Sequence, residues 1–328
     1  MKGVRVVWHY AKPIVVVSEC LGFSPCRYNG DQLNDEVVHK LAPFVQFIPI
    51  CPEMRIGLGT PRETIRLVKE DEHVRLVQPS TETDITEQMN EFSVSFLKQL
   101  LEVDGFILKS RSPSCGIKDV KIYSSKKKGP ALGKGTGMFA EHVLRMFAHK
   151  AVEEEGRLTN FVIREHFLTK LFTLALFREV KQTNSHHRLV EFHAEHKYLF
   201  MAYHQQKLKQ LGNIVANRVR LPIEEVFLRY EQTLYELSAR RSRRNSNINV
   251  CQHMIGYFKH ELSGEEKRYV HELLEKYRAG KLPLSSVTAV IRSWAIRYQN
   301  EYLLKQRYFQ PYPEPLLDVT DSGKGRDY

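Results

Sequence analysis

The spacing of apolar residues changes near residue 160, and this change constrains the fold more than any other feature of the chain. Before it, short runs rich in β-branched residues alternate with segments of helical apolar spacing. Such alternation predicts an α/β domain with a mainly parallel, Rossmann-like sheet and flanking helices. The expected strands are IVVV at 14–17, FVQFIPI at 44–50, GFIL at 105–108 and VKIY at 120–123, and the expected helices cover 34–41, 84–103 and 137–149.

After residue 160 the apolar spacing is helical and strand-like runs are scarce, so we expect an all-α domain. The expected helices cover 161–178, 188–211, 223–238, 265–279 and 285–306. The last residues contain three prolines and predict an extended tail. We therefore expect domains at 1–158 and 159–310, followed by a tail at 311–328.

The composition is that of a globular protein, because 42% of the 328 residues are hydrophobic and 27% are charged. No apolar run approaches the roughly 18–20 residues that a membrane span requires, and the N-terminal segment lacks the apolar region of a signal peptide. Five cysteines are too few for a disulfide-rich secreted scaffold, and their number is odd. We expect a cytoplasmic protein with no membrane partner.

The net charge of +11 comes mainly from the second half of the chain. Residues 1–160 carry 22 Lys and Arg against 20 Asp and Glu, whereas residues 161–328 carry 27 against 18. A basic excess in one domain favours a polyanionic partner, above all nucleic acid. A solvated basic surface is the alternative explanation.

Three cysteines follow three of the expected strands. Cys20 comes shortly after the first run, Cys51 directly after the second, and Cys115 in the loop after GFIL. The carboxyl ends of parallel strands meet at one crevice, so these thiols can converge although they are far apart in sequence. Cys26 lies six residues after Cys20 and is an alternative to it; we favour Cys20, which is nearer the strand end.

Converging thiolates suit soft metals: iron–sulfur clusters, zinc or copper(I). A structural zinc site normally takes four ligands, often in close pairs that are missing here. Three thiolates on a four-iron cluster leave one iron open for a substrate. The alternative is that these cysteines are small buried hydrophobic residues. Polar and glycine-rich surroundings favour a site, namely Glu53 beside Cys51, the loop GLGTPR at 57–62, and Ser112 and Ser114 beside Cys115.

Several motifs taken together resemble the thiouracil desulfidase (TudS-like) family, and a later segment resembles the YbgA-type helical domain. The fusion of the two is similar to the RNA-directed members of the family, which remove sulfur from 4-thiouridine in tRNA. The first resemblance rests on SEC at 18–20, RYNG at 27–30, CPE with GLGTPR at 51–62, GFILKSRSPSCG at 105–116 and VEEEGRL at 152–158, and the second on VEFHAEHKYLFMAYHQQKLKQLG at 190–212.

The resemblance implies a 4Fe–4S cluster held by Cys20, Cys51 and Cys115. It also implies hydrolytic, non-redox desulfuration, in which thiouridine becomes uridine and sulfide is released. An open iron would bind the soft thiocarbonyl sulfur and draw electrons from its carbon. Because no electrons are transferred, no nucleotide cofactor is expected.

Water then attacks the carbon, and Glu53 is the expected general base. Ser112 and Ser114 are expected to hydrogen-bond the pyrimidine ring or the developing anion. The competing role for Glu53 is structural, through an ion pair with Arg55 or Arg62. Two other functions stay open: an enzyme acting on free thiouracil or thionucleosides, and a nucleic-acid-binding protein with a structural or redox-sensing cluster.

Two basic segments are the candidate RNA contacts, and both also fit a plain basic turn or linker. KKKGPALGKGTG at 126–137 has the wrong glycine spacing for a nucleotide-binding loop, but its lysines suit phosphate groups. ARRSRRNS at 239–246 separates two expected helices. The residues in question are Lys126, Lys127, Lys128 and Lys134 in the first segment, and Arg240, Arg241, Arg243 and Arg244 in the second.

Overall fold

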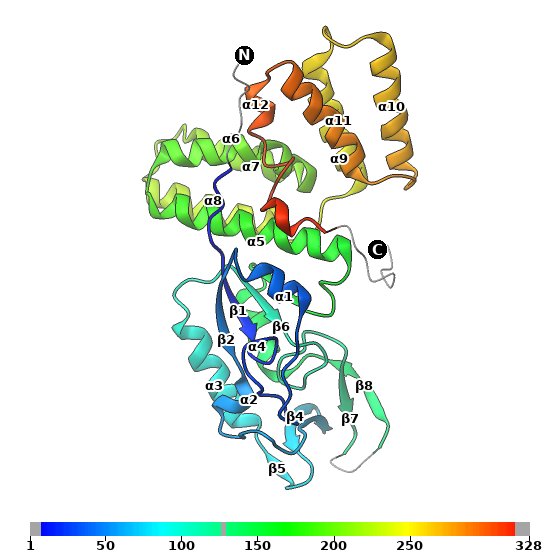
Figure 1. Ribbon diagram of the computed structural model, residues 1–328. Helices are drawn as coiled ribbons and strands as arrows, with labels where there is room; N and C mark the ends of the chain where they lie inside the picture. Colours follow the sequence, from blue (N-terminus) through cyan, green and yellow to red (C-terminus); the bar gives the residue numbers. More distant parts are fainter. Residues whose placement is uncertain (1–7, 126–128, 319–328) are drawn as a thin grey trace. The chain divides into compact units, whose positions relative to one another are not determined.

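The computed structural model describes residues 8–125 and 129–318, which fall into two compact units (Figure 1). Of the described residues, the α/β unit comprises 12–125, 129–175 and 315–318, and the helical unit comprises 8–11 and 176–314. The boundary lies inside helix α5 (Phe161–Gln182). The functional domains expected at 1–158, 159–310 and 311–328 stay a prediction.

The α/β unit contains a parallel four-stranded sheet in the order β2-β1-β6-β9. Its strands are β1 (Ile14–Ser18), β2 (Gln46–Ile50), β6 (Gly105–Leu108) and β9 (Ala151–Glu154). All residues of GFIL are buried, as in a strand covered on both faces. The predicted mainly parallel sheet with flanking helices is confirmed; β9 was missed because AVEE lacks a β-branched apolar run.

A second sheet in this unit is mostly antiparallel, with the order β5-β4-β3-β7-β8. The predicted strand at 120–123 exists but belongs here, where it pairs in parallel with β3. The other strands were missed because they are short or rich in charged and exposed residues. These missed strands are β3 (Arg66–Glu70), β4 (His73–Gln78), β5 (Thr83–Asp84) and β8 (Ala131–Gly135), and the predicted strand is β7 (Val120–Tyr123).

The helices of the α/β unit are shorter than predicted. The three that were predicted are α1 (Glu36–Leu41), α3 (Thr86–Gln99) and α4 (Met138–Phe147). The short helix α2 (Pro52–Arg55) was not predicted. The helix expected from residue 84 begins at Thr86, because Asp84 is paired with Val77 in β5. Asp84 still accepts the N–H of Thr86, at 2.8 Å. Helices α3 and α4 pack against each other through Phe92, Phe96 and Phe139.

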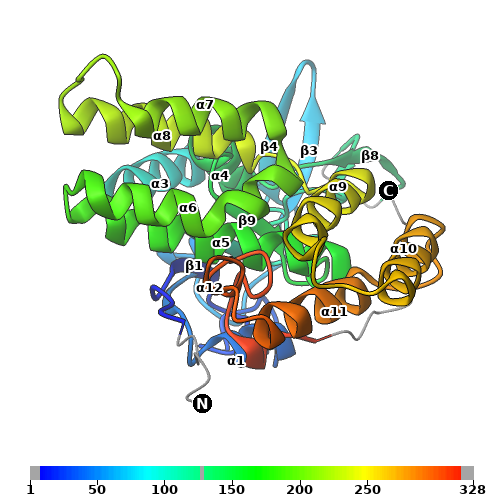
Figure 2. The ribbon, with the colours of Figure 1, turned by 90° about the horizontal axis from the view of Figure 1, so that it is seen from above.

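The helical unit is all-α in its described residues apart from loops and two 3₁₀ turns, and Figure 2 shows α7 and α8 side by side. Two predicted helices are broken, at His204 and at Gln299–Asn300, where the backbone leaves the helical region. Its elements are α6 (His186–Tyr203), α7 (Gln205–Ala216), α8 (Ile223–Leu237), α9 (Arg244–Ile255), α10 (Gly264–Arg278), α11 (Leu284–Arg297), α12 (Glu301–Leu304) and η1 (Gly256–Phe258), and η2 (Glu314–Leu316) begins at its last residue.

Helix α9 was not predicted, because its polar start resembles a linker. It is helical because one face is buried, and Ile248, Cys251 and Met254 contribute that face to the core of the unit. Cys251 is fully buried against Tyr308. Over the described part of the chain, no helix is both long and apolar enough to span a membrane.

Candidate active site

The carboxyl ends of β1, β2 and β6 border one cavity of about 350 Å³. Cys20 follows β1, Cys51 directly follows β2, and Cys115 lies in the loop after β6. The side chain of Ser18, at the end of β1, accepts the N–H of Lys109 at 2.8 Å and so ties two of these loops together. The structure therefore brings the three predicted thiols to one site.

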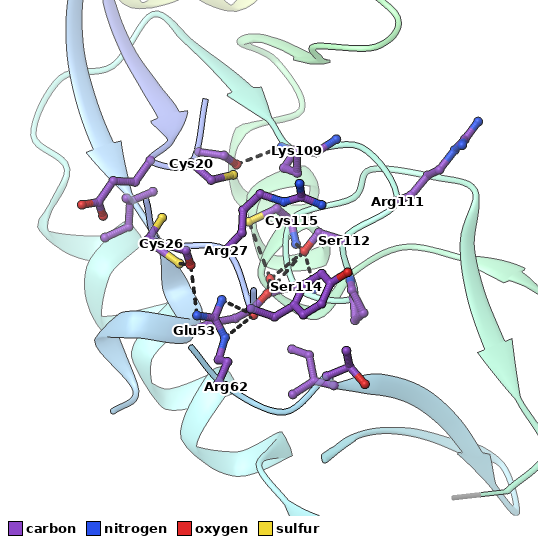
Figure 3. Close-up of a pocket in the computed structure, with 18 of the residues that line it drawn as sticks. Cys20, Cys26, Arg27, Glu53, Arg62, Lys109, Arg111, Ser112, Ser114 and Cys115 are labelled. Carbon is purple, nitrogen blue, oxygen red and sulfur yellow. Dashed lines mark hydrogen bonds and ion pairs between the residues drawn. The ribbon is translucent and has the colours of Figure 1, made fainter. Parts of the chain in front are cut away.

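A fourth thiol, that of Cys26, lines the same cavity (Figure 3). The thiol of Cys51 donates to the backbone carbonyl of Cys26 at 3.8 Å, and all of these cysteines are free thiols. The neighbouring thiol of Cys20 is the main cause that raises the pKa of Cys26 to about 12, and burial raises the pKa of Cys115 to about 12. The sequence placed Cys26 only as an alternative to Cys20; the structure has both in the cavity.

Glu53, in the first turn of α2, forms a buried ion pair with Arg62. Its Oε2 accepts from Nη2 of Arg62 at 2.6 Å and from Nε at 2.9 Å, and the two side chains are 12% and 4% exposed. Arg62 also donates to the backbone carbonyls of Cys26 and Gly59, at 3.0 and 2.8 Å. The guanidinium group therefore fixes the carboxylate and the loop around it at the same time.

The other carboxylate oxygen of Glu53 begins a chain of hydroxyl groups. Ser114 Oγ donates to Oε1 of Glu53 at 2.6 Å, and Ser112 Oγ lies 2.9 Å from Ser114 Oγ. Ser112 Oγ accepts the N–H groups of Ser114 and Cys115, each at 3.2 Å, and itself donates to Oε1 of Glu53 at 3.5 Å. The three predicted catalytic residues thus form one hydrogen-bonded chain beside the thiols (Figure 3).

Helix α4 holds the loop that carries the serines and Cys115. The N–H groups of Met138 and Ala140, in its first turn, donate to the carbonyls of Pro113 and Ser114, both at 3.0 Å. Gly137, just before the helix, is required because a Cβ there would lie 2.7 Å from the backbone of Ser114. The first N–H groups of a helix have no partner within the helix. Here they donate to the loop carbonyls, and the same hydrogen bonds position the loop.

Cations surround the cavity, and of these the sequence analysis named only Arg62, as a possible structural partner of Glu53. Lys109 is paired with Glu155, as Arg62 is with Glu53. Arg27 and Arg111 also line the cavity, and within the described residues neither forms an ion pair with a carboxylate. Arg27 reaches over the site, whereas Arg111 points away from the thiols (Figure 3). In the sequence, Arg27 and Arg111 could have been found as site residues only through the motifs RYNG and KSRSPSCG, which contain them.

Of the predicted RNA contacts in the first basic segment, Lys134 lies within the described residues and does not line the cavity. Lys126, Lys127 and Lys128 lie outside the described residues. Lys134 is exposed in β8 and pairs with Asp119 at 2.9 Å.

The predicted arginines belong to the helical unit. Arg240, Arg241 and Arg243 lie in the segment between α8 and α9. Arg244 begins α9, lies 5.7 Å from the ring of Tyr277 and donates to the carbonyl of Arg278 at 3.5 Å. Arg244 therefore has a structural role in joining α9 to the end of α10.

Comparison with known proteins divides the chain in the same two parts. A family model described as 2-thiouracil desulfurase matches residues 15–155, and one described as a protein of unknown function, DUF1722, matches residues 197–313. The uncharacterized protein YbbK of Bacillus subtilis is 32% identical over 149 residues, covering 43% of this chain and 95% of YbbK. The uncharacterized protein YbgA of Escherichia coli is 25% identical over 158 residues, covering 48% of this chain and 93% of YbgA.

Among solved structures, a [4Fe-4S]-dependent thiouracil desulfidase, TudS, is 27% identical and covers 45% of this chain and 93% of its own, with a TM-score of 0.37. The expected resemblance is confirmed by the two family models and by YbbK. The protein is accordingly a member of the 2-thiouracil desulfurase family, a desulfidase whose family domain spans residues 15–155 and is joined to a DUF1722 domain.

Proposed function

We propose that this protein hydrolyses the thiocarbonyl group of 4-thiouridine in tRNA, giving uridine and sulfide, with a 4Fe–4S cluster held by Cys20, Cys51 and Cys115. The observation that carries the proposal is the shared cavity. Three thiols from three strand ends lie there beside a carboxylate that is connected to two serine hydroxyls. Family membership supports desulfuration as the reaction, and the residues of the cavity support a hydrolytic mechanism for it.

The donor set fits an iron–sulfur cluster. Within the described residues no three His, Cys, Asp or Glu side chains are spaced to hold a single metal ion. What the cavity offers is buried cysteine thiols, which are the usual ligands of such clusters. When bound, the cluster would supply a soft Lewis acid for the thiocarbonyl sulfur.

The protein's own side chains then position one water molecule and accept one proton from it. Glu53 takes a proton from a water molecule while that water attacks the thiocarbonyl carbon, and Arg62 holds the carboxylate in place. Ser112 and Ser114 relay hydrogen bonds to Glu53 and can turn toward the ring or the developing anion. The carbon–sulfur bond breaks, the sulfur leaves as hydrosulfide, and the oxygen of water stays on the base, so no electrons are transferred overall.

The charges favour RNA over a free base as the substrate. Arg27 and Arg111 line the cavity without a carboxylate partner among the described residues, and a neutral thiouracil carries no negative charge to pair with them. Phosphate groups on either side of a thiolated nucleotide do offer such partners. The second half of the chain adds 27 Lys and Arg against 18 Asp and Glu, which suits binding to the rest of a tRNA.

The test is anaerobic reconstitution with iron and sulfide, followed by incubation with thiolated tRNA while the thiouridine absorbance is recorded. Free 4-thiouracil and 4-thiouridine are compared at equal concentration. We expect kcat/KM to be highest for tRNA. Equal turnover of the free base would favour the free-base enzyme, and a fully loaded protein that turns over none of the three would refute desulfuration and favour a structural or redox-sensing cluster.

A further inference from the structure

Two tyrosines of the helical unit stack on each other at the surface. Tyr257 lies in η1 and Tyr302 in α12, and their ring centres are 6.0 Å apart with an angle of 24° between the planes. The two residues are 43% and 36% exposed. Single exposed hydrophobic residues are normal on a protein surface, whereas two adjacent, near-parallel rings form a flat apolar surface. The pair therefore offers a place where a third ring can stack.

The two rings rest on a fixed support. The ring of Tyr198, in α6, is buried in the core of the unit and meets that of Tyr302 edge-on, with ring centres 6.3 Å apart. The buried side chain of Gln306 joins α6 to the chain just after α12. It accepts the N–H of Tyr198 at 3.3 Å and donates to the carbonyl of Ala194 at 2.9 Å. A ligand that stacks on rings held in this way loses little affinity to side-chain ordering.

Lysines without a carboxylate partner border the rings. The Nζ atom of Lys197 lies 5.7 Å from the ring centre of Tyr198 and 6.0 Å from that of Tyr302. Lys305 is exposed and follows Tyr302 by three residues, a spacing that puts side chains on one side of a helical turn. In the part of the chain that the structure describes, neither lysine forms an ion pair. Their charges are therefore available to an anionic ligand.

Exposed aromatic rings beside available cations are what an unpaired nucleotide requires, because its base stacks on a ring and its phosphate pairs with a cation. The excess of 27 Lys and Arg over 18 Asp and Glu in the second half of the chain favours such a polyanion over a protein partner.

On the basis of the proposed function, we propose that Tyr257 and Tyr302 form a stacking platform for an unpaired base of tRNA, and that Lys197 pairs with the phosphate of that nucleotide. The cavity of the α/β unit takes the thiolated base, so the platform binds a second nucleotide. Since every base has a flat face, the platform selects an unpaired base and not a particular sequence.

The experiment measures the affinity of the reconstituted protein for a tRNA transcript without thiouridine, at several salt concentrations, so that no turnover takes place. Stacking of one base is worth about 5- to 150-fold in affinity. We expect losses in this range for Tyr257→Ala and Tyr302→Ala, with an unchanged slope against salt. Lys197→Gln should reduce that slope by roughly one, because one phosphate is no longer neutralised. The matched control is Tyr269→Ala in α10, since Tyr269 is 54% exposed and forms no ring contact among the described residues.

Wild-type affinity in both alanine variants, or an equal loss in Tyr269→Ala, would overturn the platform. If the alanine variants bind tRNA normally but lose self-association in ultracentrifugation, the rings belong to a contact between two copies of the chain. If they do not fold, Tyr302→Trp decides, because it keeps a ring and reports on stacking. Quenching of its added fluorescence by the transcript supports the platform, and unchanged emission overturns it.

Failure of the proposed function has a different signature. In that case the wild type would bind the transcript through the platform, and the alanine variants would bind it more weakly, while the thiouridine absorbance of thiolated tRNA stays constant. Binding and turnover are therefore measured on the same reconstituted protein.

Discussion

Replacing Glu53 with glutamine tests the centre of the proposed reaction. The change keeps the shape of the side chain and removes its basicity. Loss of a general base typically lowers the rate by about 10²–10⁴, which equals about 2.7–5.4 kcal/mol of activation free energy at 1.36 kcal/mol per factor of ten. We expect kcat to fall in this range while the cluster is retained.

The structure adds a second effect that the assay must separate. Oε2 of Glu53 accepts two hydrogen bonds from Arg62, whose side chain is 4% exposed. Hydrogen bonds to charged groups are worth about 1.5–3 kcal/mol, and a neutral partner leaves the buried guanidinium charge uncompensated. The free energy of unfolding of Glu53→Gln should therefore fall by about 1.5–3 kcal/mol, so the rate is measured per loaded cluster by loss of thiouridine absorbance.

Ser114→Ala is the matched variant. It removes the 2.6 Å hydrogen bond to Oε1 and leaves the ion pair with Arg62 intact, so we expect a lower rate with a smaller loss of stability. If Glu53 and Ser114 act as one unit, the double variant should be little slower than Glu53→Gln alone. Turnover per cluster close to that of the wild type in Glu53→Gln would refute the role of Glu53 and leave it as a structural partner of Arg62.

Three further results are expected. Cys115→Ala should lose the iron and the visible absorbance of the cluster, whereas Cys251→Ala, whose thiol is buried in the helical unit, should keep both; iron analysis after reconstitution decides between them. Reversing the charges of Arg240, Arg241 and Arg243 should weaken tRNA binding and reduce the slope of its salt dependence by roughly one for each phosphate that is no longer neutralised, with unchanged iron content; unaltered binding in a filter assay would exclude this segment. Burial lowers the pKa of His193 to about 4, so the folded protein binds this proton less readily than the unfolded chain does; its contribution to stability is present above about pH 6.5 and is lost as the pH falls toward 4. In denaturant unfolding experiments, the free energy of unfolding of His193→Gln should fall less between those pH values than that of the wild type. The same pH dependence in both proteins would contradict the role of His193.

The residues that allowed prediction are those with a periodic or positional signal. IVVV and GFIL predict strands because both faces of the sheet are covered, so the runs are continuously apolar. The convergence of Cys20, Cys51 and Cys115 follows from parallel strands whose carboxyl ends share an edge. The second sheet has no such signal, since strands such as HVRLVQ are half exposed and depend on pairing with neighbours.

The remaining parts of the site depend on how loops run. Cys26 returns to Cys20 through a turn in which Gly22 has a φ of 99°, and no spacing in the sequence shows that return. The choice of Arg62 as the partner of Glu53 is likewise set by the path of residues 56–62. These contacts join residues that the fold brings together. Residue types in the sequence therefore suggest possible partners, but they do not show which partners meet.

The hydrogen bonds from the start of α4 to the Cys115 loop have a consequence for the order of assembly. The carbonyls of Pro113 and Ser114 are held by amides of Met138 and Ala140, so the loop takes its shape from the polypeptide itself. These amides can exchange with solvent only when the first turn of the helix opens. We therefore expect the Cys115 loop to keep its shape in the protein before any cluster is inserted, because its carbonyls are held by backbone amides of α4.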